Sequence, residues 1–183
     1  MTTVIGGSSP SITFSDSTTQ STAALPLTGG TLTGALTPST TAGIVGTTIG
    51  DNANAGSVGE YVSSSVSPPS TGLTSGTVTN ATSISLTAGD WDITGLIFFN
   101  FGSGTTSTYS IGAISTTSAT IPGSPYFSTQ LFATQNTGTG CALPVPTIRL
   151  NITSTTTVYL VGQSSFTGGT NGIGGFIAAR RRR

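Results

Sequence analysis

Two neighbouring carboxylates are the residues of this chain best suited to chemistry. Asp90 and Asp92 flank Trp91, and in a strand the alternation of side chains would place both carboxylates on one face. Paired carboxylates act as acid and base in hydrolases, and with several further oxygen ligands they hold hard cations. Nothing in the sequence supports a set of several further oxygen ligands at this place, so we predict turn hydrogen bonds and ion pairs with arginine. We expect no catalytic residue, no metal site and no cofactor.

The remaining composition excludes most enzyme classes. The 183 residues include five Arg or Lys, five Asp or Glu and no histidine, and the sequence contains no lysine. Nucleophilic catalysis by a Ser–His or Ser–Lys arrangement is therefore excluded. Soluble domains are about one quarter charged residues, whereas this chain is 5% charged with a formal net charge of zero. A surface without self-repulsion favours stable association with a partner.

Four of the five basic residues form one run, namely Arg180, Arg181, Arg182 and Arg183. The fifth is Arg149. A basic run can bind nucleic acid. The chain has zero net charge and no other basic patch, so its positive surface is too small for such binding. We therefore predict that the run pairs with acidic residues of its own or a neighbouring subunit.

The sequence predicts neither membrane insertion nor secretion. No stretch reaches the roughly 18 apolar residues that span a bilayer. Residues 1–7 have neither the positive region nor the apolar core of a secretion signal. We therefore expect assembly in a cytoplasm. Cys141, the single cysteine, cannot form an intrachain disulfide, and the neighbouring sequence has no cation that would activate its thiol.

Two regions of the chain follow different patterns. Residues 1–56 carry sparse apolar side chains between Thr, Ser, Gly and Pro, without a helical period. A single copy could not bury them, so the region is either a flexible arm or a segment that several chains wrap together. Residues 57–183 show short apolar runs with frequent turn signals, which is typical of a β-sandwich or barrel.

Eight strands are predicted in the second region. They are Ser57–Val66, Thr79–Thr87, Trp91–Phe101, Thr108–Ser115, Tyr126–Ala133, Leu143–Ile152, Thr156–Gln163 and Gly172–Arg180. Several of them, such as residues 97–101 and 158–161, are apolar on both faces. Strands covered on both faces favour a two-layer sandwich that also packs against neighbouring subunits.

Three segments resemble bacteriophage fibre proteins. Residues 25–36, LPLTGGTLTGAL, resemble the LPLTGGTMTG motif of phage tail fibres, with Leu32 where the family usually has Met. Residues 12–23, ITFSDSTTQSTA, are similar to the stretch that often precedes that motif. Residues 86–93 and 175–183 are similar to a globular head of phage and prophage fibres, which resembles trimeric jelly rolls of the tumour necrosis factor and complement type. Residues 37–56 are not covered by the resemblance.

The resemblance implies a non-enzymatic, homotrimeric virion fibre. Residues 1–56 would attach to other virion proteins and form a short shaft, and residues 57–183 would fold into an eight-stranded antiparallel jelly-roll sandwich as the knob. The expected shaft contacts are Ile12, Phe14, Leu25, Leu27, Leu32 and Leu36. We expect a tail fibre that meets a glycan or protein of the host surface. A head fibre or capsid decoration protein, a bacterial adhesin and a polysaccharide depolymerase are the alternatives, in that order.

Strand parity then predicts two chemically different ends for the knob. If consecutive strands alternate in direction, connections 67–78, 102–107, 134–142 and 164–171 lie together at the end away from the shaft. The candidate receptor residues there are Gln135, Asn136, Phe166 and Asn171. The charged residues should gather at the shaft-side end. They are Asp51, Glu60, Asp90, Asp92, Arg149, Arg180, Arg181, Arg182 and Arg183.

Overall fold

The chain forms two compact units in a computed structural model, Met1–Ile49 and Gly50–Arg183. The structure describes residues 12–13, 15, 19–20, 48–123, 128–134, 138 and 140–183. In the first unit, β1 (Ile12–Thr13) and β2 (Thr19–Gln20) pair antiparallel. The side chain of Ile12 lies outside the described part, as do the other expected shaft contacts, namely Phe14, Leu25, Leu27, Leu32 and Leu36.

The boundary between the units lies after Ile49, rather than after residue 56 as we predicted. Residues 50–56 belong with the second unit because they are tied to the start of its first strand. The side-chain amide of Asn52 donates to the carbonyl of Tyr61 at 2.7 Å, and the backbone N–H of Tyr61 donates back to Asn52 at 3.0 Å. A polar segment can therefore join a β-sandwich without any apolar signal in its sequence.

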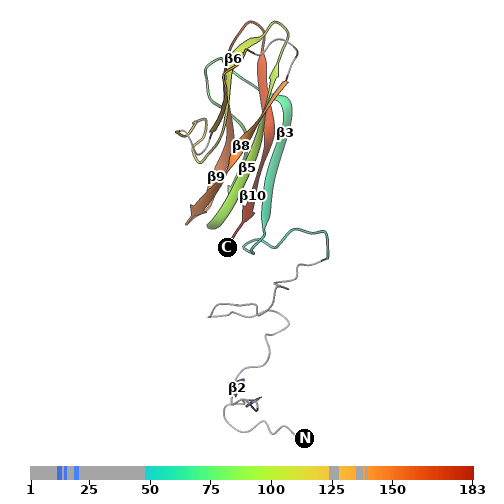
Figure 1. The fold of residues 1–183 in the computed structure, drawn as a ribbon, viewed down its shortest axis with the longest axis vertical. Helices are drawn as coiled ribbons and strands as arrows, with labels where there is room; N and C mark the ends of the chain where they lie inside the picture. The colour runs from blue at the N-terminus through green and yellow to red at the C-terminus, as the bar shows by residue number, and fades with distance from the viewer. Residues whose placement is uncertain are drawn as a thin grey trace. The chain divides into compact units, whose positions relative to one another are not determined.

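The second unit is an all-β jelly roll built from two four-stranded antiparallel sheets (Figure 1). Its strands are β3 (Tyr61–Gly72), β4 (Thr79–Leu86), β5 (Gly89–Phe101), β6 (Thr106–Ser115), β7 (Ser128–Leu131), β8 (Gly140–Ile152), β9 (Thr156–Thr167) and β10 (Asn171–Arg181). The first sheet has the order β3-β10-β5-β8 and the second the order β4-β9-β6-β7. Every connection except β6–β7 crosses from one sheet to the other, which is the jelly-roll pattern. The eight-stranded sandwich that we predicted is confirmed.

Most strand boundaries differ from the predictions by a few residues, and β3 continues to Gly72 rather than ending at residue 66. β3 begins at Tyr61 rather than at residue 57, because the chain first turns at Gly59, whose φ is +91°. β9 continues to Thr167 rather than ending at residue 163, and β7 is described only for Ser128–Leu131. Among the described residues there is no helix, and thus none that could cross a membrane.

The core lies between the inner faces of the two sheets. Alternate residues of β5 point inward and are buried, from Trp91 and Ile93 at one end to Phe99 and Phe101 at the other. The second sheet must leave room for these large side chains. A Cβ built on Gly112 would lie 2.4 Å from the Ile97 side chain, so glycine lets this sheet approach that side chain closely.

The two ends of the sandwich are set by the alternating strand directions. Connections β3–β4, β5–β6, β7–β8 and β9–β10 meet at one end, which we call the loop end. Backbone hydrogen bonds join them there, from Leu73 N–H to Asn171 O and from Gly102 N–H to Thr170 O, both at 2.8 Å. The start of β3, the other three connections and the end of β10 meet at the opposite end, which we call the terminal end (Figure 1). The predicted strand parity is correct.

Candidate functional site

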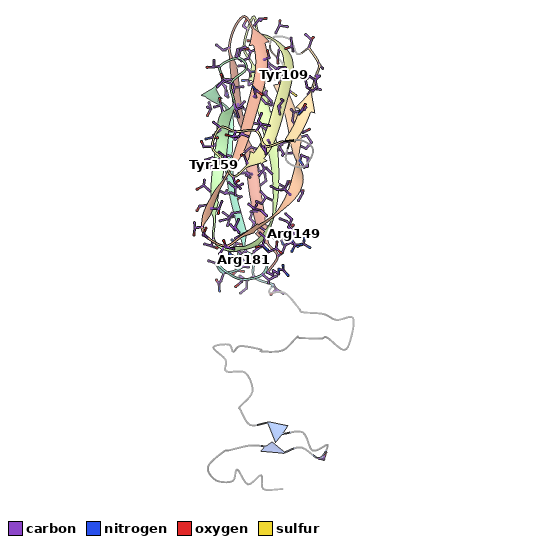
Figure 2. All side chains as sticks on the ribbon, turned by 90° about the vertical axis from the view of Figure 1, so that its left-hand side faces the viewer. Tyr109, Arg149, Tyr159 and Arg181 are labelled. Carbon is purple, nitrogen blue, oxygen red and sulfur yellow. The ribbon has the colours of Figure 1, made fainter. Side chains whose placement is uncertain are left out.

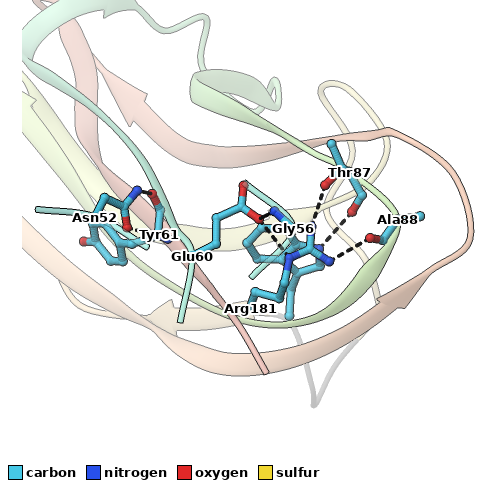
Figure 3. Close-up of polar contacts among 8 residues, drawn as sticks. Asn52, Gly56, Glu60, Tyr61, Thr87, Ala88 and Arg181 are labelled. Atoms are coloured by element: carbon cyan, nitrogen blue, oxygen red, sulfur yellow. Dashed lines mark hydrogen bonds and ion pairs between the residues drawn. The ribbon is translucent and has the colours of Figure 1, made fainter. Parts of the chain in front are cut away.

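A buried ion pair between Glu60 and Arg181 lies at the terminal end (Figure 3). Arg181 Nε donates to Glu60 Oε2 at 2.8 Å, and the two side chains are only 5% and 9% exposed, respectively. The same guanidinium donates to the carbonyl of Ala88 at 2.8 Å and to the hydroxyl of Thr87. Its central carbon lies 4.3 Å from the centre of the Trp91 ring. One side chain thus joins β10 to the start of β3 and to the β4–β5 turn.

The local backbone fits around that guanidinium. β10 runs beside β5 with Arg181 opposite Trp91, so the arginine lies over the aromatic ring. At the start of β5, a Cβ on Gly89 would come within 1.9 Å of Arg181 Nη1, and φ there is +150°. Only glycine fits this close approach without displacing the arginine.

Glu60 has a second donor besides Arg181. The backbone N–H of Gly56 donates to Glu60 Oε2 at 2.7 Å. This hydrogen bond first, and then the one from Arg181, lower the pKa of Glu60 despite the opposing effect of burial. The carboxylate therefore stays ionised, and its role is to hold Arg181 and the backbone of Gly56 in place.

Asp90 is the centre of a second group of ion pairs. Arg149 holds it with two hydrogen bonds, Nε to Oδ1 at 2.8 Å and Nη2 to Oδ2 at 2.5 Å. Arg183 Nε lies 3.1 Å from Asp90 Oδ2. The hydrogen bonds from Arg149 are the main reason that the pKa of Asp90 is lowered, and the pair raises the pKa of Arg149. A more exposed pair, Arg182 with Asp92 at 3.4 Å, lies beside it.

The structure thus brings most of the predicted charge cluster together at the terminal end. We call the ion-paired residues the charge clasp, and they are Glu60, Asp90, Asp92, Arg149, Arg181, Arg182 and Arg183. Arg180 lies over the ring of Tyr61, at 5.9 Å from its centre, and Asp51 is exposed. The interpretation of Asp90 and Asp92 as ion-paired residues is confirmed, since each carboxylate faces an arginine. Figure 2 shows Arg149 and Arg181 at this end and Tyr109 toward the other.

The predicted receptor residues fall into three different situations. Gln135 and Asn136 lie outside the described residues. Phe166 is half-buried, and its backbone is fixed by hydrogen bonds of 2.7 and 2.8 Å with the Ser75 hydroxyl. Asn171 is buried, because strand alternation turns its side chain between the sheets, opposite Phe101. The expectation that Asn171 lies on the loop surface is therefore wrong.

Sequence reasoning missed one exposed aromatic residue. We had placed Phe132 inside a strand, but β7 ends at Leu131 and leaves Phe132 73% exposed. Its ring lies against Tyr109, with 5.9 Å between the centroids and 43° between the planes. No turn residue marks the end of this strand, so the sequence carried no signal for this exposure.

Comparison of this chain with known proteins finds only distant structural similarity. No protein family and no curated protein matches the chain. The structure is similar to a solved structure of infectious bursal disease virus, Gx strain, with 16% identity over 67% of this chain and a TM-score of 0.43. It is also similar to the crystal structure of the infectious bursal disease virus VP2 subviral particle, with 16% identity over 68% of this chain and a TM-score of 0.37. The chain spans about a third of each, 32% and 30%, respectively.

Function must therefore be inferred from the residues of this chain. Within the described part, no three His, Cys, Asp or Glu side chains gather as a metal site would require. Cys141 is buried in β8, and burial raises the pKa of its thiol, which disfavours the reactive thiolate. The arrangement is suited to holding strands together at one end and to making uncharged contacts at the other.

Proposed function

We propose that this chain is a non-enzymatic structural protein of a bacteriophage virion, namely a homotrimeric tail fibre whose jelly roll is the knob. The observation that carries the proposal is the combination of a fibre-type motif in residues 25–36 with a separate jelly-roll unit that follows it. In this proposal the N-terminal unit attaches to other virion proteins, and the knob meets the host surface.

The polarity of the knob supports this role. The charge clasp ties the chain's entry into β3 to the end of β10, where a knob would have to resist pulling from its shaft. The connections at the loop end contain no charged residue. Contact there would depend on shape, hydroxyls and aromatic rings rather than on ionic steering.

An apolar row on the first sheet supports self-association. The register aligns Phe176 of β10 with Leu96 of β5, and Leu96 with Pro144 of β8. Leu96 is 42% and Phe176 36% exposed, on the outer face of a sheet whose inner face is already packed. Exposed apolar side chains on neighbouring strands mark a protein contact surface. In our proposal this row is covered by the neighbouring subunits.

Absence of catalysis is part of the same proposal. The two buried carboxylates, Glu60 and Asp90, are both engaged by arginine, and their pKa values are lowered rather than raised as a general acid would need. Incubation of the protein with polysaccharide of the host surface should release no reducing sugar. Release by the wild type that is lost on substitution of Asp90 and Asp92 would contradict a purely structural role.

Two measurements test the proposal. Light scattering on the purified full chain should give three chain masses, and a monomer at micromolar concentration would overturn the trimer. Immunogold labelling of intact particles should place the protein at the tail. Labelling on the capsid would instead identify a head fibre or decoration protein, and labelling of the bacterial surface alone would identify an adhesin.

A further inference from the structure

An exposed aromatic side chain, Phe132, lies against a half-buried one, Tyr109, near the loop end of the second sheet. Phe132, at 73% exposure, is the most exposed large apolar side chain in the described part of the chain. Tyr109 supports one side of its ring and leaves the remainder open to water. A ring in this position offers a flat apolar face to a partner at little conformational cost, because it has few rotatable bonds.

Polar groups lie directly beside this pair. The register places Gln163 of β9, Ile111 of β6 and Gln130 of β7 in one row. In the adjacent row Ser110 is buried with its hydroxyl bonded inside the sandwich, so strand alternation turns the row of Ile111 outward. Gln130 is exposed, and Gln163 is held in place by the hydrogen bond that its Nε2 donates to Gly76 O at 2.6 Å.

The surface around these residues is uncharged. The connections of the loop end contain no Asp, Glu or Arg, and the ion pairs of the described residues lie at the terminal end. An anionic or cationic ligand would find no counter-charge here. The available groups are aromatic faces, carboxamides and hydroxyls, which match a ligand with an apolar face and a rim of hydroxyl groups.

A neutral pyranose has this chemistry. One face of the ring presents C–H groups that can stack on an aromatic side chain, while its hydroxyls can exchange hydrogen bonds with carboxamides. We propose that Phe132, Tyr109, Gln130 and Gln163, which we call the aromatic platform, bind a neutral sugar unit of the host surface. This inference rests on the proposed fibre function and assigns the class of its receptor.

The size of the platform favours a sugar over a protein partner. Stable protein interfaces bury about 1,200–2,000 Å², far more than two rings and two carboxamides supply. The apolar row of Leu96 and Phe176, which suits a neighbouring subunit, belongs to the other sheet. A single platform should bind weakly, and a trimer would present three copies to a repeating polysaccharide, which raises the overall affinity.

Saturation-transfer NMR on the full chain tests the platform. The probes are the methyl pyranosides of glucose, galactose and N-acetylglucosamine at millimolar concentration. We expect transfer to at least one of them, weakened roughly five- to tenfold by Phe132→Ser because the stacked ring is lost. Phe132→Tyr, which keeps the ring, should retain binding. Val58→Ser is the matched control, since Val58 is 70% exposed and precedes β3 at the terminal end.

The outcomes separate this inference from the proposed function. No transfer to any probe, or equal binding by wild type and Phe132→Ser, overturns the platform. A Phe132→Ser protein that changes molar mass without affecting any sugar signal shows that the ring is a subunit contact, which also overturns it. A wild-type monomer that still binds sugar through Phe132 overturns the trimeric fibre and leaves the platform standing. Circular dichroism of Phe132→Ser checks that the loss comes from the missing ring rather than from unfolding.

Discussion

Substitution of Glu60 by glutamine should destabilise the jelly roll far more than a matched change in an exposed pair. Glu60→Gln keeps the size of the side chain but leaves the guanidinium of Arg181 buried without its counter-charge. Breaking a buried ion pair from one side typically costs about 3–5 kcal/mol. Because Arg181 keeps its hydrogen bonds to Ala88 and Thr87, we expect the lower end, about 3 kcal/mol.

The control is Asp92→Asn, which breaks the half-exposed pair with Arg182 at 3.4 Å. Exposed pairs contribute roughly 0–1 kcal/mol. For a unit of this size, 1 kcal/mol moves Tm by roughly 3–5 °C, so Glu60→Gln should lower Tm by roughly 10 °C and Asp92→Asn by only a few degrees.

Thermal unfolding followed by tryptophan fluorescence is the assay. Trp91 is the only tryptophan and lies under Arg181, so its emission reports on the clasp itself. All variants must be compared at one protein concentration, because association shifts Tm. Equal losses for Glu60→Gln and Asp92→Asn would refute the reasoning, since they would show that burial of the pair does not govern its contribution.

Three further outcomes follow from the structure. The pKa of Glu60 is lowered from its ordinary value of 4.5, so its contribution to stability should be complete above that pH and lost as the pH falls through the folded pKa. Unfolding midpoints against pH should fall less steeply on the acid side in Glu60→Gln than in wild type, and a loss remains in the variant because the pKa of Asp90 is lowered as well. Gly89→Ala should lower Tm because its Cβ would displace Arg181, whereas Gly123→Ala, with no atom within 4 Å of the new Cβ, should not; equal melting curves would contradict the close approach. Leu96→Glu places a charge on the apolar row and should reduce the molar mass measured by light scattering, and an unchanged mass would exclude the row as a subunit contact.

Much of the sandwich could be predicted because strands carry local signals. Alternation and turn residues located the eight strands, and their parity then located both ends of the unit. The same parity predicted that Asp90 and Arg149 lie at one end, although 59 residues separate them.

The predictions that were wrong concern contacts between strands, which a single sequence does not reveal. β9 extends past Gln163 because the Ser164 hydroxyl is satisfied inside the sandwich by Ser107 at 2.8 Å. Asn171 faces inward because β10 begins one residue earlier than predicted, opposite the end of β5. Phe132 is exposed because β7 ends at Leu131. In each case the outcome depends on the neighbouring strand rather than on the local pattern.

The position of β10 has a consequence for the order in which the knob can form. β10 is the last strand of the unit in sequence, yet it lies between β3 and β5 in the first sheet. During synthesis β3 has no partner in its own sheet until residues 171–181 have left the ribosome. Pairing over such a sequence separation is slow, since a long loop must close before any contact forms. The jelly roll therefore completes only after its last strand is made. In the proposed trimer, the N-terminal segments of neighbouring chains would have that interval in which to associate.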